Sequence, residues 1–362
     1  MRFTVDGSDI LEEKIAGDMA AVRSSVLEAV GPENITALVL GGGYGRGEGG
    51  VFDRGEGEIP YNDYDFFVVV PFGSRRRRRR MAAQLNALKS SLEPTCGLHV
   101  DFGPPMPLES LSHLPYEIMN MEAKAGYHVV YGPEKIFDAM PDYDTARPPL
   151  EEGARLLMNR GVGLLMAKML LREKSSLDTF EHEFCVRNIY KALMAQGDCV
   201  LIAHGVYGTR YSDRLRRFDS VSDASLPEPA RLRAAYERSL AFKLRPDHVV
   251  PGGLTLESWL DETMDFYRTF FLWFERFRLN LDSLDWETYA KLPARLPKVG
   301  GADRLRNLYR SARAWPGGID RPFEWVLHPR DRILRRLPRL LAGNGASPRE
   351  EAFVLKLWEQ CG

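Results

Sequence analysis

The stretch DYDFFVVV, residues 63–70, constrains the fold of this chain more than any other segment. Side chains alternate between the two faces of a β-strand, so Asp63 and Asp65 point to the same face. The opposite face then carries only apolar and aromatic side chains, which are Tyr64, Phe66, Val68 and Val70. The pattern predicts a strand that is buried on one face and acidic on the other.

Other segments supply the partners that such a strand needs. Short apolar runs predict three more strands, at Ile35–Leu40, Leu98–Phe102 and Tyr127–Tyr131. Apolar residues at helical spacing predict flanking helices over Ile15–Val30 and Met81–Leu92, the second ending near a proline. The fold class expected from these elements is α+β, with a small mixed sheet and flanking helices.

The second half of the chain has a different pattern. A segment rich in Pro and Asp, Met140–Leu150, is the expected linker. Helices are predicted beyond it, at Glu151–Glu173, Phe180–Gln196, Cys199–Val206, Pro229–Lys243 and Leu256–Leu279. We therefore predict a first domain of residues 1–145 and a mostly α-helical domain of residues 146–362, in which the region after Leu292 has no assigned role.

The acidic face of the central strand indicates a metal site. Two adjacent carboxylates repel each other unless a cation neutralises them. A hard divalent cation with oxygen ligands, Mg²⁺ or Mn²⁺, does this and also binds substrate phosphates. Asp101 lies in another short apolar strand, HVDF, and could complete the site from a neighbouring strand. Asp63, Asp65 and Asp101 are thus the candidate metal ligands and catalytic residues.

A glycine-rich loop, GGYGRGE at residues 42–48, lies between the first strand and these acids. Glycines allow backbone N–H groups to approach phosphate oxygens closely. The loop lacks the G-K-[ST] of a Walker loop and is not a convincing dinucleotide-binding fingerprint. The candidate nucleotide-binding residues here are Gly42, Gly43, Arg46 and Glu48; the last two either bind a ligand or pair with each other.

In this order, the motifs resemble the DNA polymerase β-like nucleotidyltransferase superfamily, especially its small-molecule (aminoglycoside-type) and minimal members. That group carries a G-S-x-[AG]-R-G-[ED] loop, then D-x-D on a strand, then one more strand acid. The matching residues, which span roughly 35–103, are Gly42, Gly43, Arg46, Gly47, Glu48, Asp63, Asp65 and Asp101. Two departures are Gly43, where the family has Ser, and the segment Gly49–Tyr61, which lengthens the spacing and is either a flap or a determinant of acceptor choice.

The resemblance implies an activity. Two metal ions held by the acids would grip ATP or another NTP, and a nucleoside monophosphate, expected to be AMP, would pass to a small-molecule hydroxyl or phosphate with release of pyrophosphate. Asp101 would help to bind the metal nearer the acceptor and could take the proton. Family members also place a basic residue of the helical domain on the phosphates, so Arg187 and Lys191, on one helix face, join the nucleotide-binding candidates.

Two other functions stay open. One is modification of a macromolecule, either AMP on a protein side chain or nucleotides on a tRNA end, and the other is a non-catalytic nucleotide-binding or antitoxin module. The arginine run Arg75–Arg80 favours nucleic acid, because a basic run can neutralise phosphates. However, the run opens a predicted amphipathic helix and contains no aromatic residues, which favours a solvated helix start.

Composition bounds the class of protein. Lys plus Arg is 49 and Asp plus Glu is 50, so a net charge of -1 argues against the whole molecule being an electrostatic nucleic-acid binder. The four cysteines are scattered, which argues against a disulfide framework and fits a cytoplasmic protein. No membrane span or signal peptide is expected. Acceptor identity, the choice of NTP and the oligomeric state stay open.

Overall fold

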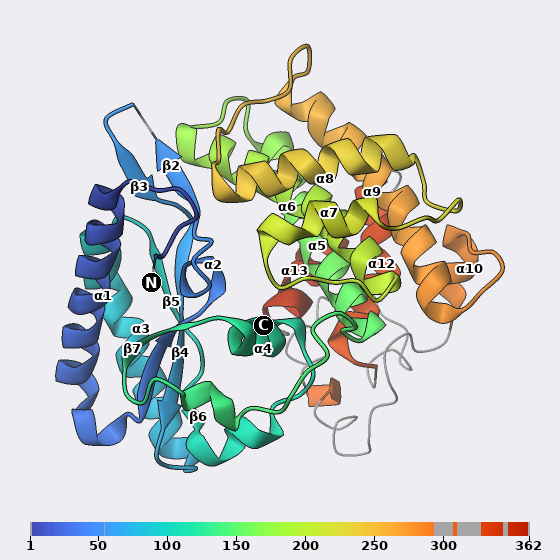
Figure 1. Cartoon of the computed structure of the whole chain (residues 1–362). Helices are drawn as coiled ribbons and strands as arrows, with labels where there is room; N and C mark the ends of the chain where they lie inside the picture. Colours follow the sequence, from blue (N-terminus) through green and yellow to red (C-terminus); the bar gives the residue numbers. More distant parts are fainter. Residues whose placement is uncertain (1, 54, 293–306, 310–326, 343–346, 361–362) are drawn as a thin grey trace. The chain divides into compact units, whose positions relative to one another are not determined.

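The computed structural model describes residues 2–53, 55–292, 307–309, 327–342 and 347–360 (Figure 1). The chain divides into two compact units. The first contains residues 1–148 together with two later segments, Gly208–Arg214 and Leu240–Asp247, and the second contains the rest. Both later segments fall within residues 146–362, the predicted helical domain, but they belong to the first unit of the structure.

The first unit is built around a small sheet. Its elements are α1 (Asp9–Val30), η1 (Pro32–Asn34), β1 (Ala37–Leu40), α2 (Gly42–Gly45), β2 (Val51–Asp53), β3 (Glu58–Pro60), β4 (Asp63–Val70), α3 (Arg75–Cys96), β5 (His99–Phe102), β6 (Met106–Pro107), η2 (Leu108–His113), α4 (Ile118–Ala125), β7 (His128–Tyr131) and η3 (Ile136–Ala139).

The sheet is mixed, with strand order β5-β4-β1-β7 and β6 paired to β4. Strand β1 is antiparallel to β4 and to β7, whereas β5 and β6 are parallel to β4. The four strands predicted from the sequence are therefore present. Strands β1, β5 and β7 are shorter than their apolar runs, and β4 spans Asp63–Val70.

Both faces of the sheet are covered. Helices α1 and α3 lie side by side on the face that carries Tyr64, Phe66, Val68 and Val70, all of them buried (Figure 1). The other face packs Val39 and Val69 against residues of η2, α4 and η3. These residues do not cover Asp65, whose side chain is exposed. The alternation in β4 thus produces a buried face and a partly open acidic face, as predicted.

The second unit is mostly helical. The described helices after residue 149 are α5 (Leu150–Glu173), α6 (Thr179–Ala203), α7 (Tyr211–Asp219), α8 (Pro229–Leu244), α9 (Leu256–Leu279), α10 (Trp286–Lys291), α12 (Pro329–Leu341) and α13 (Pro348–Glu359). The start of α7 and the end of α8 belong to the first unit, and the other residues of these helices belong to the second. The predicted fold class, a small mixed sheet with flanking helices followed by a mostly helical region, is confirmed.

One predicted break between helices is wrong. The two helices expected over 180–206 are the single helix α6, because Gly197 and Asp198 lie against α8 instead of breaking the helix. A Cβ at Gly197 would lie 2.1 Å from the Tyr236 ring, and the Tyr236 hydroxyl donates to Asp198 at 2.6 Å. Helix α3 continues past its proline to Cys96 and ends where Gly97 adopts a left-handed φ of 76°.

Two further features of the described residues concern membrane spans and disulfides. Across the described residues, no helix combines the length and the apolar character that a membrane crossing requires. Cys96, Cys185 and Cys199 are buried free thiols, and Cys361 lies outside the described residues.

Candidate active site

The three candidate acids lie on adjacent strands. Parallel pairing of β4 with β5 places Asp65 directly opposite Asp101, while Asp63 lies opposite His99. Directly paired residues of neighbouring strands point to the same face, and so do residues two apart on one strand. The carboxylates of Asp63, Asp65 and Asp101 therefore share one face of the sheet at the start of β4.

The glycine-rich loop is fitted against Asp65. The backbone N–H of Gly41 donates to the Asp65 carbonyl oxygen at 2.8 Å. Gly42 has a φ of 61°, and a Cβ at this position would lie 2.6 Å from Oδ2 of Asp65. Glycine at position 42 therefore satisfies both a left-handed backbone and a close approach to the acid.

Gly43 occupies the position at which the family that the motif resembles has serine. The structure gives a steric reason for glycine here. A Cβ at position 43 would lie 2.9 Å from the Glu48 carbonyl oxygen, which is closer than real Cβ contacts. The Glu48 N–H in turn donates to the Gly43 carbonyl at 2.8 Å, so the loop folds back on itself. A serine would require this backbone to shift.

Asp101 has a cation beside it. Nζ of Lys89 on α3 donates to Oδ1 of Asp101, whose side chain is 65% exposed. Within the described residues, no group of three or more His, Cys, Asp and Glu side chains is arranged to hold a metal ion by itself. Mg²⁺ is commonly bound through one or two carboxylates plus substrate phosphates and waters. Asp63 and Asp65, side by side on one face, fit that donor set.

The buried side of β4 is tied down by a polar network. The Tyr64 hydroxyl donates to Oδ2 of Asp18 at 2.9 Å, and Lys14 binds the same carboxylate and the Cys96 carbonyl. Burial raises the pKa of Tyr64 well above its ordinary value, with a further contribution from Asp18. Because Tyr64 stays protonated and held by Asp18, it fixes the strand segment between the two acids.

Arg46 and Glu48 are buried and have separate partners. Arg46 is 7% exposed and its Nη1 lies 3.2 Å from Oε2 of Glu122. Glu48 is 3% exposed and accepts from the backbone N–H groups of Tyr211 and Ser212 at 3.0 and 3.2 Å. The sequence leaves open whether these two residues bind a ligand or pair with each other, and the structure gives each a partner elsewhere in the first unit.

Sequence reasoning missed the residues that the later segments bring to this loop. Lys243 places its Nζ 5.6 Å from the centre of the Tyr211 ring, and its carbonyl oxygen would lie 3.1 Å from a Cβ at Gly50. Within the described part of the chain, Lys243 forms no salt bridge. No local sequence signal distinguishes it from the other basic residues of its helix, so contacts between distant segments were needed to find it.

The other predicted phosphate ligands lie in the second unit. Arg187 and Lys191 are both on α6, and the Arg187 guanidinium lies 6.0 Å from the centre of the Phe184 ring. They are four residues apart on one helix, as expected. Their role in nucleotide binding stays a prediction.

The segment Gly49–Tyr61 is a hairpin. Strands β2 and β3 pair antiparallel, with Phe52 opposite Ile59. The Tyr44 hydroxyl fastens its base by donating to the Gly50 carbonyl at 2.7 Å and accepting from the Tyr61 N–H at 2.6 Å. The longer spacing between the loop and the acids is thus filled by a small sheet that begins and ends beside the loop.

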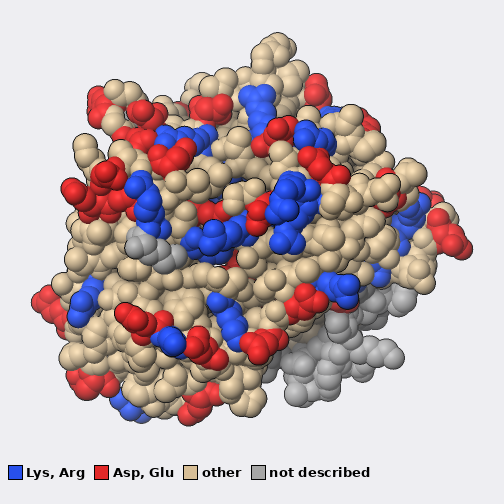
Figure 2. Space-filling model, viewed as in Figure 1, with Lys and Arg blue, Asp and Glu red and all other residues tan. Residues whose placement is uncertain are grey.

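The arginine run begins α3 as expected. Ser74 precedes the helix, and Arg75, Arg76, Arg79 and Arg80 are exposed. Asp63 and Asp65 lie at the start of β4, whereas Arg75 follows the end of that strand in the chain. On the face of the molecule that Figure 2 shows, basic and acidic side chains are interspersed over much of the surface.

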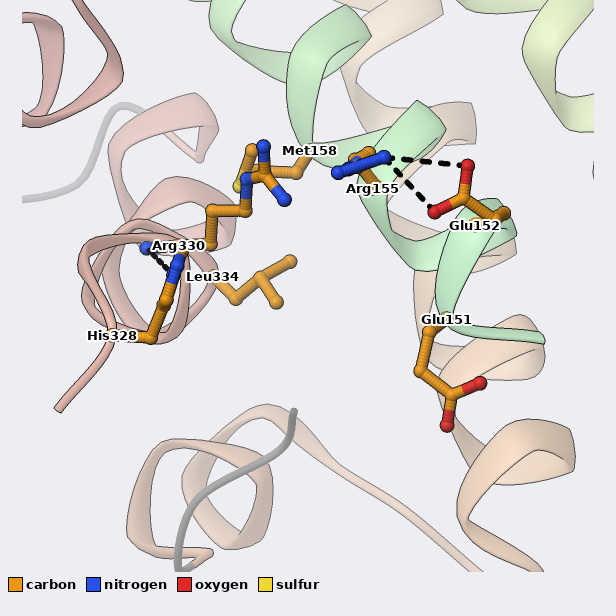
Figure 3. Close-up of a pocket in the computed structure, with 7 residues that line it drawn as sticks. All are labelled: Glu151, Glu152, Arg155, Met158, His328, Arg330 and Leu334. Atoms are coloured by element: carbon orange, nitrogen blue, oxygen red, sulfur yellow. Dashed lines mark hydrogen bonds and ion pairs between the residues drawn. The ribbon is translucent and has the colours of Figure 1, made fainter. Parts of the chain in front are cut away.

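A pocket of about 190 Å³ lies in the second unit. Figure 3 shows Glu151, Glu152, Arg155 and Met158 from α5 on one side of it, and Arg330 and Leu334 from α12, with His328 just before that helix, on the other. Nη1 of Arg155 donates to Oε1 of Glu152 at 3.1 Å, so opposite charges line one wall. None of the residues proposed from the sequence lines this pocket.

Comparison with known proteins adds a structural likeness. No family model matches the chain, and no curated protein gives a significant match. A crystal structure of the spectinomycin adenyltransferase AAD(9) from Enterococcus faecialis, with ATP and spectinomycin, is similar over 70% of this chain and 99% of that chain. The identity is 12% and the TM-score is 0.37. A shared activity does not follow at that level, so the function proposed below rests on the residues of the first unit.

Proposed function

We propose that this chain is a metal-dependent nucleotidyltransferase. It would transfer a nucleoside monophosphate, expected to be AMP from ATP, to a hydroxyl or phosphate of a small molecule. The observation that carries the proposal is the alignment of Asp65 with Asp101 on parallel strands, with Asp63 on the same face and Gly42 packed against Asp65. Acids in this arrangement beside a glycine loop suit a magnesium–triphosphate ligand.

The residues have distinct roles in the proposed reaction. Asp63 and Asp65 would hold Mg²⁺ or Mn²⁺, which when bound neutralises charge on the phosphates. The acceptor oxygen forms a bond to the α-phosphorus, and the bond from that phosphorus to the bridging oxygen breaks. Pyrophosphate leaves with the electron pair, and Asp101 takes the proton of the acceptor hydroxyl. Catalysis is then mainly positioning and charge neutralisation.

Calorimetry tests the metal requirement. We expect ATP to bind measurably only with Mg²⁺ or Mn²⁺, and the Asp63→Asn/Asp65→Asn variant to lose this metal-dependent binding. Asp138→Asn is the matched control, because Asp138 is an exposed acid of the same unit on η3. Tight binding of ATP without metal, unchanged in the double variant, would contradict the proposal. Incubating α-labelled NTPs with a metabolite and protein extract would then identify the base and the acceptor together.

Lysine variants test the phosphate contacts. The Lys243 ammonium lies beside the Tyr211 ring and has no carboxylate partner among the described residues. We expect Lys243→Met to weaken ATP binding by roughly tenfold, the effect of losing one charge-assisted contact. Lys191→Ala is also expected to weaken NTP use, on the strength of the family resemblance. Lys356→Met, an exposed basic residue of α13, is the control. Unchanged ATP affinity in either variant removes that lysine from the site.

A further inference from the structure

The glycine-rich loop ends in charged residues that belong to a buried network. Burying an unpaired charge is costly, so buried charges are found with partners. Glu122 on α4 supplies the partner of Arg46 and also binds Arg214, whose Nη2 lies 2.5 Å from Oε1 of Glu122. Arg214 is also buried, with 1% of its surface exposed. The Glu122 carboxylate therefore connects the loop to a residue that lies more than 160 positions later in the chain.

The segment Gly208–Arg214 contacts the loop at further points. Nε of Arg214 donates to the Gly208 carbonyl at 2.8 Å, which closes the segment on itself. Two guanidinium groups lie near the Tyr211 ring, with the Arg46 Cζ at 5.4 Å and the Arg214 Cζ at 4.4 Å from its centre. Such cation–π contacts are strongest where water is excluded.

Glu48 provides the remaining connection. Helix α7 begins at Tyr211, and the first N–H groups of a helix have no partner within the helix. Glu48 accepts two of them, from Tyr211 and Ser212, and also accepts from the Ser212 hydroxyl at 3.1 Å. A carboxylate at this position also interacts favourably with the helix dipole.

Packing around Arg46 restricts the loop further. A Cβ at Gly126 would lie 2.9 Å from Cγ of Arg46, so the stem of the arginine is pressed against the turn after α4. From Arg46 the loop leads back within a few residues to Gly42, which is in contact distance of Asp65. A shift of the arginine would thus be transmitted to the part of the loop that faces the acids.

We propose that Glu122 and Arg214 are positioning residues, which hold the glycine loop against Asp65 through Arg46. The loop clamp consists of Arg46, Glu48, Glu122, Tyr211 and Arg214. Within it, Arg46 and Glu48 serve as supports of the loop, whereas the sequence left open whether they bind the nucleotide or pair with each other. The effect on nucleotide binding rests on the proposed function, but the effect on the loop does not.

Hydrogen exchange of the full-length protein tests the clamp without any ligand. We expect Glu122→Gln to speed exchange of the amides of residues 41–48 by tenfold or more, which is about 1.4 kcal/mol of local opening free energy. Glu275→Gln is the matched control, because it removes a carboxylate that is even more buried than Glu122 from an arginine, Arg278, in the second unit. The control should leave exchange of the loop unchanged. Unaltered loop protection in Glu122→Gln overturns the proposal.

A conservative variant keeps the test decisive if Glu122→Gln does not fold. Glu122→Asp retains the negative charge on a shorter side chain. The exchange rate of its loop amides should therefore lie between the rate of the wild type and the rate expected for Glu122→Gln. Arg214→Lys retains a charge for Glu122 but loses the fork that also reaches the Gly208 carbonyl. Faster loop exchange in Arg214→Lys supports the clamp, and wild-type exchange in both variants overturns it.

Nucleotide binding separates the two proposals. A loop displaced from Asp65 should raise the KM for ATP in Glu122→Gln by about tenfold or more, because small misplacements cost rate and affinity steeply. The Glu275→Gln control should keep the wild-type KM. If wild-type protein uses no NTP but the loop amides respond as expected, the nucleotidyltransferase proposal fails and the clamp stands. If wild-type protein uses ATP and the loop amides do not respond, the clamp alone fails.

Discussion

Gly42 shows how closely one residue of this chain is fitted to its neighbour. Its φ of 61° lies in the left-handed region, and a side chain there would meet the carboxylate of Asp65 at 2.6 Å. Both constraints act at the same position, so an alanine would be strained by its backbone and would also push the acid aside. The glycine therefore determines where Asp65 points as much as the strand does.

Buried thiols give a second example at the residue scale. Burial raises the pKa of Cys96 to about 11 and that of Cys185 to about 11. In a Cys361→Ser background, we expect native protein at pH 8 to react with a thiolate-selective reagent only after unfolding, because the thiolate is the reactive form. Rapid reaction of the native protein would contradict this expectation.

The same shift predicts how stability depends on pH. The folded pKa of Cys96 lies above the ordinary thiol value of 9.0, so its contribution to the free energy of unfolding is fully present below pH 9 and is lost as pH rises through about 11. Urea unfolding at pH 8, 9.5 and 11 measures this loss. Cys96→Ala should show a flatter dependence than the parent over the same range.

At the scale of elements, α3 begins against the usual charge preference. Six arginines occupy its first turns, although the N-terminus of a helix favours negative charge. Two of them have partners: Arg77 donates to Oδ1 of Asn34 at 2.9 Å, and Arg78 donates to the Pro105 carbonyl at 3.3 Å. Arg77, which is exposed, and Arg78, which is half-buried, thus connect the start of the helix to neighbouring segments.

Replacing exposed members of the run should stabilise the protein. We expect Arg75→Glu/Arg76→Glu to raise the free energy of unfolding by roughly 0.3–1 kcal/mol per residue at low salt, because the dipole then meets acids. Turnover of a small-molecule acceptor should stay nearly intact. Arg77→Glu is the contrast, since it also removes the hydrogen bond to Asn34. Loss of turnover together with loss of salt-sensitive RNA binding would favour modification of tRNA instead.

Local patterns predicted the elements better than their partners. The alternation in residues 63–70 predicted β4 and its two faces, because side-chain direction in a strand depends only on position. The pairing of Asp65 with Asp101 depends on parallel register, and the sequence indicated only that Asp101 lay on a neighbouring strand. Glu122 and Arg214 carried no local signal at all, because their significance comes from tertiary contacts with Arg46.

At the scale of the whole molecule, the two units are interleaved in sequence. The segments Gly208–Arg214 and Leu240–Asp247 belong to the first unit although residues of the second unit precede, separate and follow them. Besides the loop clamp, Arg245 pairs with Asp6 near the start of the first unit and with Glu58 on β3. The boundaries between the units fall inside helices α7 and α8, which continue without a break. A hydrophobic pattern along the chain therefore cannot reveal where one unit ends and the other begins.

The fragment 1–148 tests what the later segments contribute. Both apolar clusters of the first unit lie wholly within it, so we expect the fragment to fold. Glu48→Gln should destabilise the full-length chain by about 1–3 kcal/mol, since Glu48 there accepts from Tyr211 and Ser212. In the fragment those donors are gone and Glu48 meets water, so the same change should alter stability by less than about 0.5 kcal/mol.

Asp18→Asn provides the control for that comparison. The partners of Asp18, Tyr64 and Lys14, are both retained in the fragment, so this substitution should destabilise the fragment and the full-length chain alike. Urea unfolding of the six proteins gives both differences. If Glu48→Gln costs the fragment as much as it costs the full-length chain, Glu48 acts through residues 1–148 alone. The loop would then not depend on Gly208–Arg214, and the acids would need no later segment to keep their glycine loop in place.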